Sequence, residues 1–158
     1  MVLIVDDHQP VRDILTYVMT REGYLVVSAE SGRSALTLAA AERIDVALID
    51  VHMPEMNGLE VCTRLRDQSE LSGRHFPIWL MTGAGNTETE RKAVQCGAWG
   101  LLRKPFDFVK LKETLEIGFA APIPPRAESP GSAVAAATDP LSRSLPSWNG
   151  LHHVDVGR

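Results

Sequence analysis

The sequence Val2-Leu3-Ile4-Val5-Asp6-Asp7 is a short apolar run that ends in two carboxylates, and this arrangement recurs along the chain. Later apolar runs lead into Asp50, Thr82 and Lys104. Short apolar runs bounded by turn residues are typical of buried strands in a parallel sheet. In open α/β sheets, ligands bind outside the carboxyl ends of the strands. We therefore expect three carboxylates, one hydroxyl and one ammonium to lie along the same edge of a sheet.

Amphipathic helical patterns separate the apolar runs. Residues 11–18 place Val11, Ile14, Leu15 and Val18 at helical spacing, and four polar residues are suited to cap later helices: Ser31, Asn57, Asn86 and Asp107. Five strands that alternate with five helices predict an α/β fold, a doubly wound parallel sheet with helices on both faces. The alternation fixes this class but leaves the strand order open.

The length and composition predict one folded domain followed by a tail. Residues 1–120 carry the alternating pattern and form the expected domain. Residues 121–158 hold six of the ten prolines in a Pro/Ala/Ser-rich stretch with one aromatic residue, Trp148. Such a stretch buries too little apolar area to offset its ordering entropy, so we expect a flexible C-terminal tail.

The charge and cysteine content exclude several classes of function. A net charge of −4 provides no basic surface, which disfavours direct binding of nucleic acid. No apolar run is long enough to span a bilayer, so we expect a cytoplasmic protein without membrane contact. Cys62 and Cys96 have no neighbours at metal-ligand spacing and are interpreted as buried thiols in a reducing compartment.

The five polar residues suit phosphoryl chemistry with a divalent cation. A carboxylate such as Asp50 can attack an activated phosphoryl group and hold it as an acyl phosphate. Because both groups are anionic, a cation is needed between them, and Mg²⁺ prefers carboxylate and phosphate oxygens. We expect Asp7 and Asp50 to bind it directly, and Asp6 to bind it through water. Lys104 and Thr82 would then contact phosphoryl oxygens.

Each of these residues also has an ordinary structural explanation. An acidic pair such as Asp6-Asp7 often marks a solvated helix start, and Asp50 before a loop is common turn chemistry. Thr82 can be a simple loop residue and Lys104 a surface ammonium. Their joint placement after strands one, three, four and five favours the functional interpretation.

The motifs resemble those of receiver domains from bacterial two-component response regulators, which have a chemotaxis-regulator-like fold. The resemblance covers roughly residues 1–120 and rests on four stretches: 5–7 (Val-Asp-Asp), 50–58 (Asp-Val-His-Met-Pro-Glu-Met-Asn-Gly), 81–83 (Met-Thr-Gly) and 104–106 (Lys-Pro-Phe). It implies a flavodoxin-like strand order of 2-1-3-4-5. It also implies phosphorylation of Asp50, contacts from Lys104 and Thr82 to the phosphoryl group, and a cis Lys104-Pro105 bond. The implied Mg²⁺ ligands are Asp6, Asp7, Asp50 and the carbonyl of His52.

One position departs from the family pattern. Receiver domains commonly carry Tyr or Phe three residues before the lysine, and this chain has Leu101. Phosphoryl acceptance does not need that ring, but its absence puts the usual coupling of Thr82 to the helix-four surface in doubt. By strand alternation Trp99 falls on the same face as Leu101 and is a candidate substitute, although core packing is the favoured explanation for it.

The leading functional hypothesis is a phosphorylation-controlled switch rather than an enzyme. The resemblance implies that a histidine kinase or phosphotransfer protein donates the phosphoryl group, and that an unknown downstream protein is the target. A phosphatase generally needs a second carboxylate two residues after its nucleophile, where this chain has His52. A flavin or nucleotide module would need a Gly-rich loop after the first strand, where Asp6-Asp7 stands instead.

Overall fold

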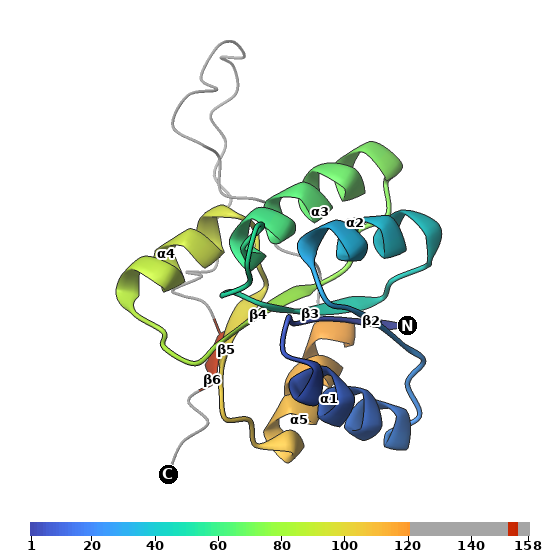
Figure 1. Cartoon of the computed structure of the whole chain (residues 1–158), viewed down its shortest axis with the longest axis vertical. Helices are drawn as coiled ribbons and strands as arrows, with labels where there is room; N and C mark the ends of the chain where they lie inside the picture. The colour runs from blue at the N-terminus through green and yellow to red at the C-terminus, as the bar shows by residue number, and fades with distance from the viewer. Residues whose placement is uncertain (121–151, 155–158) are drawn as a thin grey trace, which may run out of the picture.

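The computed structural model describes residues 1–120 and 152–154, which form one parallel sheet flanked by helices (Figure 1). The strand order is β2-β1-β3-β4-β5-β6, so the five predicted strands lie in the predicted 2-1-3-4-5 order. The strands are β1 (Val2–Val5), β2 (Val26–Ala29), β3 (Val46–Asp50), β4 (Ile78–Thr82), β5 (Gly100–Arg103) and β6 (His152–Val154). The helices are α1 (Gln9–Arg21), α2 (Gly32–Ala41), α3 (Gly58–Ser72), α4 (Thr87–Gln95) and α5 (Phe108–Ala120).

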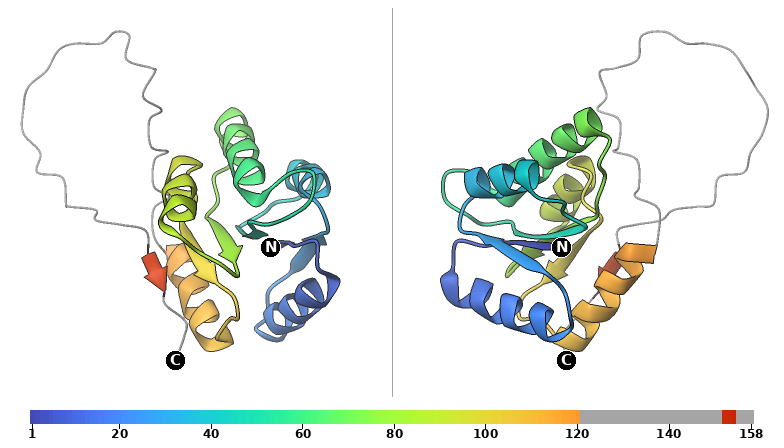
Figure 2. Two further views of the ribbon diagram at one scale, coloured as in Figure 1. Left: turned by 60° about the vertical axis from the view of Figure 1, so that its left-hand side comes forward. Right: turned by 90° about the vertical axis from the view of Figure 1, so that its right-hand side faces the viewer.

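The helices cover both faces of the sheet, as the alternating pattern predicts (Figures 1 and 2). One apolar core lies between the sheet and α2, α3 and α4, and it includes Ala35, Leu65 and Ala93. The other lies between the sheet and α1 and α5, and it includes Leu15 and Leu115. Strands β1, β3 and β4 are buried along their whole length, which explains why they have no polar alternation in the sequence.

The side-chain caps predicted at the starts of α2, α3 and α4 form. The side chain of Ser31 accepts a hydrogen bond from the Ser34 amide, and Asn86 accepts one from Thr89. Asn57 accepts from the Glu60 amide, but the Glu60 carboxylate pairs with Arg64 instead of completing a capping box. The helices that position the loops of the sheet edge therefore begin where the sequence predicts.

Residues 24–27 form an apolar run that predicts a strand from Tyr24, but β2 begins only at the third residue of this run. The amide of Tyr24 donates to the carbonyl of Met19, and Gly23, with a φ of 88°, donates to Thr20. These bonds complete the C-terminal turn of α1, so Tyr24 belongs to the helix end and the strand starts at Val26.

Trp99 does not lie on the face of Leu101, so that expectation is wrong. Leu101 packs in the core under α3 and α4, whereas Trp99 packs in the opposite core, with its ring centroid 6.5 Å from that of Trp79. Strand β5 begins only at Gly100, so Trp99 lies before the regular alternation. A Cβ on Gly100 would lie 2.3 Å from the Trp79 ring, so the missing side chain makes room for the indole.

Strand β6 falls in the segment for which the sequence predicts a flexible tail. It pairs in parallel with β5, with Gly100 opposite His152 and Leu102 opposite Val154. The outer edge of β5 offers main-chain N–H and C=O groups, and pairing with them needs no particular side chains. A strand of only three residues therefore has no side-chain pattern that the sequence could reveal. The rest of the predicted tail, 121–151 and 155–158, lies outside the described residues. Within the described part, none of the helices combines the length and the apolar character needed to cross a bilayer.

Candidate functional site

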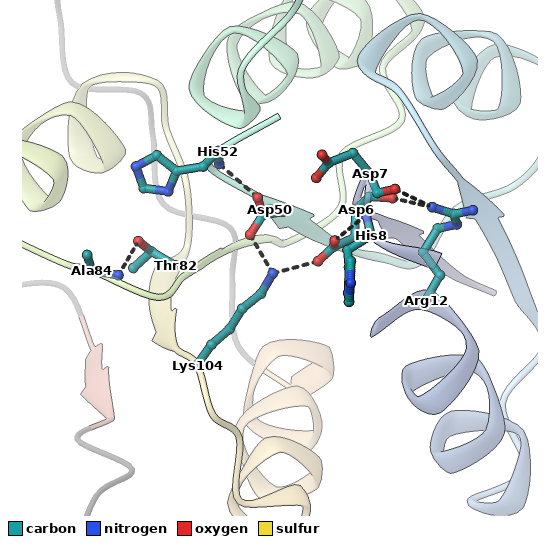
Figure 3. Close-up of polar contacts among 9 residues, drawn as sticks. All are labelled: Asp6, Asp7, His8, Arg12, Asp50, His52, Thr82, Ala84 and Lys104. Atoms are coloured by element: carbon teal, nitrogen blue, oxygen red, sulfur yellow. Dashed lines mark hydrogen bonds and ion pairs between the residues drawn. The ribbon is translucent and has the colours of Figure 1, made fainter. Parts of the chain in front are cut away.

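The parallel strands bring the predicted polar residues to one edge of the sheet (Figure 3). Asp6 directly follows β1, Asp50 ends β3, Thr82 ends β4 and Lys104 directly follows β5. Since β1 pairs with β3, and β4 pairs with both β3 and β5, these residues occupy neighbouring strand ends. The edge that the sequence predicts is therefore formed, and we call it the carboxyl edge because it lies at the carboxyl ends of the strands.

Lys104 links the two buried carboxylates. Its Nζ lies 2.6 Å from Oδ2 of Asp6 and 2.6 Å from Oδ1 of Asp50. Asp6 is 1% exposed and Asp50 is 5% exposed, so water contributes little to stabilising their charges. One ammonium between two carboxylates offsets part of the desolvation cost and part of their mutual repulsion.

The remaining oxygen of each carboxylate accepts a backbone hydrogen bond. The amide of His8 donates to Oδ1 of Asp6 at 2.9 Å, and the amide of His52 donates to Oδ2 of Asp50 at 2.8 Å. Both carboxylates are thus held at both oxygens, which fixes their orientation toward Lys104. A preset orientation lowers the reorganisation needed for a reaction at Asp50.

Burial changes the proton affinity of the site. Desolvation raises the pKa of Asp50 above its ordinary value, and Asp6 adds to the rise, while the hydrogen bond and charge of Lys104 act in the opposite direction. Burial lowers the pKa of Lys104, but its bonds to Asp50 and Asp6 outweigh this effect and raise it overall. Lys104 is therefore a permanent cation at neutral pH.

The raised pKa of Asp50 predicts that Asp50→Asn stabilises the protein at pH 7 without divalent cations. A folded-state pKa above the unfolded value of about 3.9 means that protonated Asp50 favours folding, and that this contribution is lost as the pH rises through the folded pKa. At pH 7 the ionised group therefore costs stability, and the amide removes that cost. We expect a gain of about 1 kcal/mol, or ~3 °C in melting temperature, in thermal unfolding with EDTA. An equal gain at pH 3 would contradict this explanation.

Thr82 connects the sheet edge to the loop before α4. Its side chain is fully buried, and Oγ1 accepts a hydrogen bond from the Ala84 amide at 3.2 Å. The Thr82 carbonyl accepts from the Lys104 amide at 2.8 Å, so the two residues are also joined through the backbone. The Lys104-Pro105 bond is cis, as the resemblance implies.

Asp7 and His52 lie at the same edge but on its outer side. Both residues are exposed, and the Asp7 carboxylate makes none of the contacts drawn in Figure 3. Among the described residues, no three His, Cys, Asp or Glu side chains stand close enough together to hold a metal ion as they are placed. Two of the expected ligands, Asp6 and Asp50, do lie close together, since the Lys104 ammonium contacts both carboxylates. Carboxylate oxygens are ligands that Mg²⁺ prefers, so the residues present fit this ion.

Arg12 is a residue of the site that sequence analysis did not identify. Its Nη1 donates to the carbonyl of Asp6 at 2.8 Å and to that of Asp7 at 3.1 Å. Arg12 thereby ties the first turn of α1 to the backbone that carries the acidic pair. An arginine one turn into an amphipathic helix is an ordinary surface residue by sequence, so no pattern could have singled it out.

Gly58 allows the loop after Asp50 to close against the strand. A Cβ at this position would lie 2.1 Å from the carbonyl oxygen of Asp50, and the Gly58 amide donates to Val51. Because the clash involves backbone, Gly58→Ala should destabilise the protein by about 2 kcal/mol, measured by urea unfolding. Gly83→Ala is the matched control, since a Cβ there meets no atom within 4 Å. Equal losses in both variants would contradict the steric argument.

A separate groove lies at the opposite end of the sheet. Its volume is about 810 Å³, and residues between α2 and β3 and between α3 and β4 line it, among them Arg43, Arg74 and Phe76. None of the residues that line it belongs to the group around Asp50. The groove is therefore separate from the strand ends that carry Asp6, Asp50 and Lys104.

Comparison with known proteins gives one consistent family. Residues 2–116 match the family described as the response regulator receiver domain. Regulatory protein AtoC of Escherichia coli (strain K12) is 37% identical over 110 residues, which are 70% of this chain and 23% of AtoC. Response regulator MprA of Mycolicibacterium vanbaalenii is also 37% identical over 110 residues, which are 70% of this chain and 46% of MprA. The chain thus spans less than half the length of these relatives.

The solved structures agree with the sequence matches. Chemotaxis protein CheY4 of Vibrio cholerae superposes with a TM-score of 0.69 at 36% identity, over 74% of this chain and 96% of that protein. FixJ-N superposes with a TM-score of 0.67 at 30% identity, over 78% of this chain and 95% of that structure. With its strand order and its paired carboxylates bridged by a lysine, the chain belongs to the response regulator receiver domain family.

Proposed function

We propose that Asp50 accepts a phosphoryl group in a Mg²⁺-dependent reaction, and that the modified chain changes its binding to a partner protein. Phosphoryl acceptance on an aspartate is characteristic of receiver domains. The observation that carries the assignment is the environment of the Asp50 carboxylate. It is buried at a strand end, oriented by the His52 amide and bridged to Asp6 by Lys104.

The proposed metal ligands are the Asp6, Asp7 and Asp50 carboxylates with the carbonyl of His52. When bound, Mg²⁺ would neutralise negative charge shared by the carboxylates and the incoming phosphoryl group. The convergence of Asp6 and Asp50 on one cation supports this assignment. The exposed Asp7 carboxylate lies at the same edge and is not engaged by Lys104.

The protein residues have distinct roles in the transfer. An oxygen of ionised Asp50 attacks phosphorus, and the bond from phosphorus to the donor breaks, with the donor leaving group taking up a proton. The Lys104 ammonium, now 2.6 Å from Oδ1 of Asp50, would instead pair with a phosphoryl oxygen. The Thr82 hydroxyl would donate its hydrogen to another oxygen, and turning toward that oxygen would break the bond that Oγ1 now accepts from the Ala84 amide.

The contact between Thr82 and Ala84 also suggests how the signal leaves the site. Ala84 lies in the loop that leads to α4, so a change of partner at Oγ1 would shift the start of that helix. Leu101 is almost fully buried beside this region, in the core under α3 and α4. We infer that switching here works through an aliphatic side chain where most receiver domains use an aromatic one.

The proposed partners are a histidine kinase or phosphotransfer protein as donor and a downstream protein as target. The role is that of a signalling switch that reacts once per cycle rather than an enzyme with external substrates. We place it in the cytoplasm and propose no direct contact of this chain with nucleic acid, in keeping with its net charge of −4.

The test is phosphorylation by a small phosphodonor such as acetyl phosphate. With Mg²⁺ the intact mass should rise by about 80 Da, one phosphoryl group, and EDTA should prevent the rise. Cleavage after Lys and Arg places Asp50 in peptide 44–64 and Asp6 and Asp7 in peptide 1–12. The label should be found in peptide 44–64. Labelling in peptide 1–12, or labelling that persists in EDTA, would refute the proposal.

A further inference from the structure

Two cysteines far apart in the sequence meet under α4, away from the carboxyl edge. Cys62 lies in α3 and is fully buried, and Cys96 is the C-cap of α4 and is 5% exposed. The Sγ of Cys62 lies 3.4 Å from the carbonyl oxygen of Cys96, and both residues are thiols in the structure. The sheet and helices thus hold close together two thiols that are 34 positions apart in the chain.

A buried guanidinium accompanies the pair. Arg66 lies one helical turn after Cys62 and is 4% exposed. Its Nε donates to the carbonyl of Gly97, the residue next to Cys96, and its Nη1 donates to the carbonyl of Phe76. Among the described residues, nothing accepts a hydrogen bond from Nη2. A buried cation with an unused donor beside two thiols favours the thiolate, which is the reactive form of cysteine.

The electrostatics agree with this geometry. Contact with the Cys62 thiol lowers the pKa of Cys96 below its ordinary value, and the charge of Arg66 contributes in the same direction against the effect of burial. In turn, the two cysteines partly counter the fall that burial causes in the pKa of Arg66. Each of the three groups therefore stabilises the charged form of another.

We propose that Cys62 and Cys96 form a reversible disulfide when the protein meets a peroxide, which makes the pair an oxidation-sensitive link between α3 and α4. The Cys96 thiolate attacks one peroxide oxygen, the O–O bond breaks, and the departing hydroxide takes up a proton as water. The Cys62 sulfur then attacks the sulfenic sulfur of Cys96, the S–O bond breaks, and the Cys62 proton leaves with hydroxide as a second water. Two thiols lose two electrons, and one peroxide becomes two waters.

The link would act on the helix that follows Thr82. Cys96 caps the C-terminal end of α4, so a bond to Cys62 would fix that end to α3. Amides of α4 should then exchange with solvent more slowly in the oxidised protein. This effect does not involve Asp50, and it can be measured whether or not the chain accepts a phosphoryl group.

The experiment is titration of the full chain with hydrogen peroxide, followed by intact mass and peptide analysis. Disulfide formation removes two hydrogen atoms, a loss of about 2 Da, and links peptide 44–64 to peptide 93–103. Dithiothreitol should separate the peptides. Oxygen addition without linkage, unreacted thiols, or a disulfide between two chains would overturn the proposal.

Three variants sharpen the result. Cys62→Ala and Cys96→Ala should each prevent the linkage. Arg66→Met should slow it on the order of tenfold, the change expected when a thiol pKa moves by one unit. If Arg66→Met shows the wild-type rate, the role given to Arg66 is wrong.

Discussion

Asp50→Asn should abolish phosphorylation by acetyl phosphate and Mg²⁺. The amide has nearly the shape of the carboxylate and its oxygen can still accept a bond from Lys104, but it is not a nucleophile toward phosphorus. Because Asp6 keeps its own contact with Lys104, the surrounding structure should persist. We expect no measurable mass gain under conditions in which the wild-type chain is fully modified.

Asp45→Asn is the matched control for this variant. Asp45 immediately precedes β3, at the other end of the strand that Asp50 terminates, and it lies on the same peptide, 44–64. It is exposed and pairs with the terminal amine of Met1, away from Lys104. The control should be labelled as fast as wild type. Undiminished labelling of Asp50→Asn would assign the reaction to another residue.

Lys104→Met should slow phosphoryl acceptance by about 100-fold, the typical effect of removing one donor to a developing negative charge. The substitution removes the cation shared by two buried carboxylates and leaves Asp6 and Asp50 to repel one another. It also removes the group that lowers the pKa of Asp50, so a larger share of that residue will be protonated. The measurement is the initial rate of mass gain at saturating Mg²⁺.

Lys112→Met separates this effect from a general loss of positive charge. Lys112 lies on α5 and pairs with Glu22 at 2.5 Å, so it belongs to the contact between α5 and the end of α1. Its loss should leave the labelling rate within about twofold of wild type, as for a surface ion pair remote from the site. Equal losses in the two lysine variants would contradict the local role of Lys104.

The carboxyl edge could be predicted from the sequence because few constraints determine it. Strands β1, β3 and β4 are buried, almost wholly apolar runs, and parallel pairing places all the strand ends on one side. It follows that Lys104 lies near Asp6 and Asp50, although 98 and 54 positions separate them in the chain. The 2.6 Å contacts do not follow, because they depend on side-chain conformations that no sequence pattern specifies.

Other features depend on tertiary context. Strand β2 begins at Val26 rather than at Tyr24 because the Tyr24 amide donates a hydrogen bond to the end of α1. Strand β6 uses main-chain pairing with β5, which has no side-chain signature. Trp99 packs beside Trp79 because it precedes β5, where strand alternation does not yet apply, and the missing side chain of Gly100 leaves room for the Trp79 ring.

The pairing of Trp79 with Trp99 has a practical consequence for spectroscopy. Both indoles sit in the layer formed with α1 and α5, on the reverse side of the sheet from α4. Emission from this pair will report disturbances of that layer and will respond weakly to a displacement confined to α4. A fluorescent dye attached at position 94, which is partly exposed on α4, would give an independent fluorescence signal from that helix. Recording both emissions would show on which side of the sheet a signal travels.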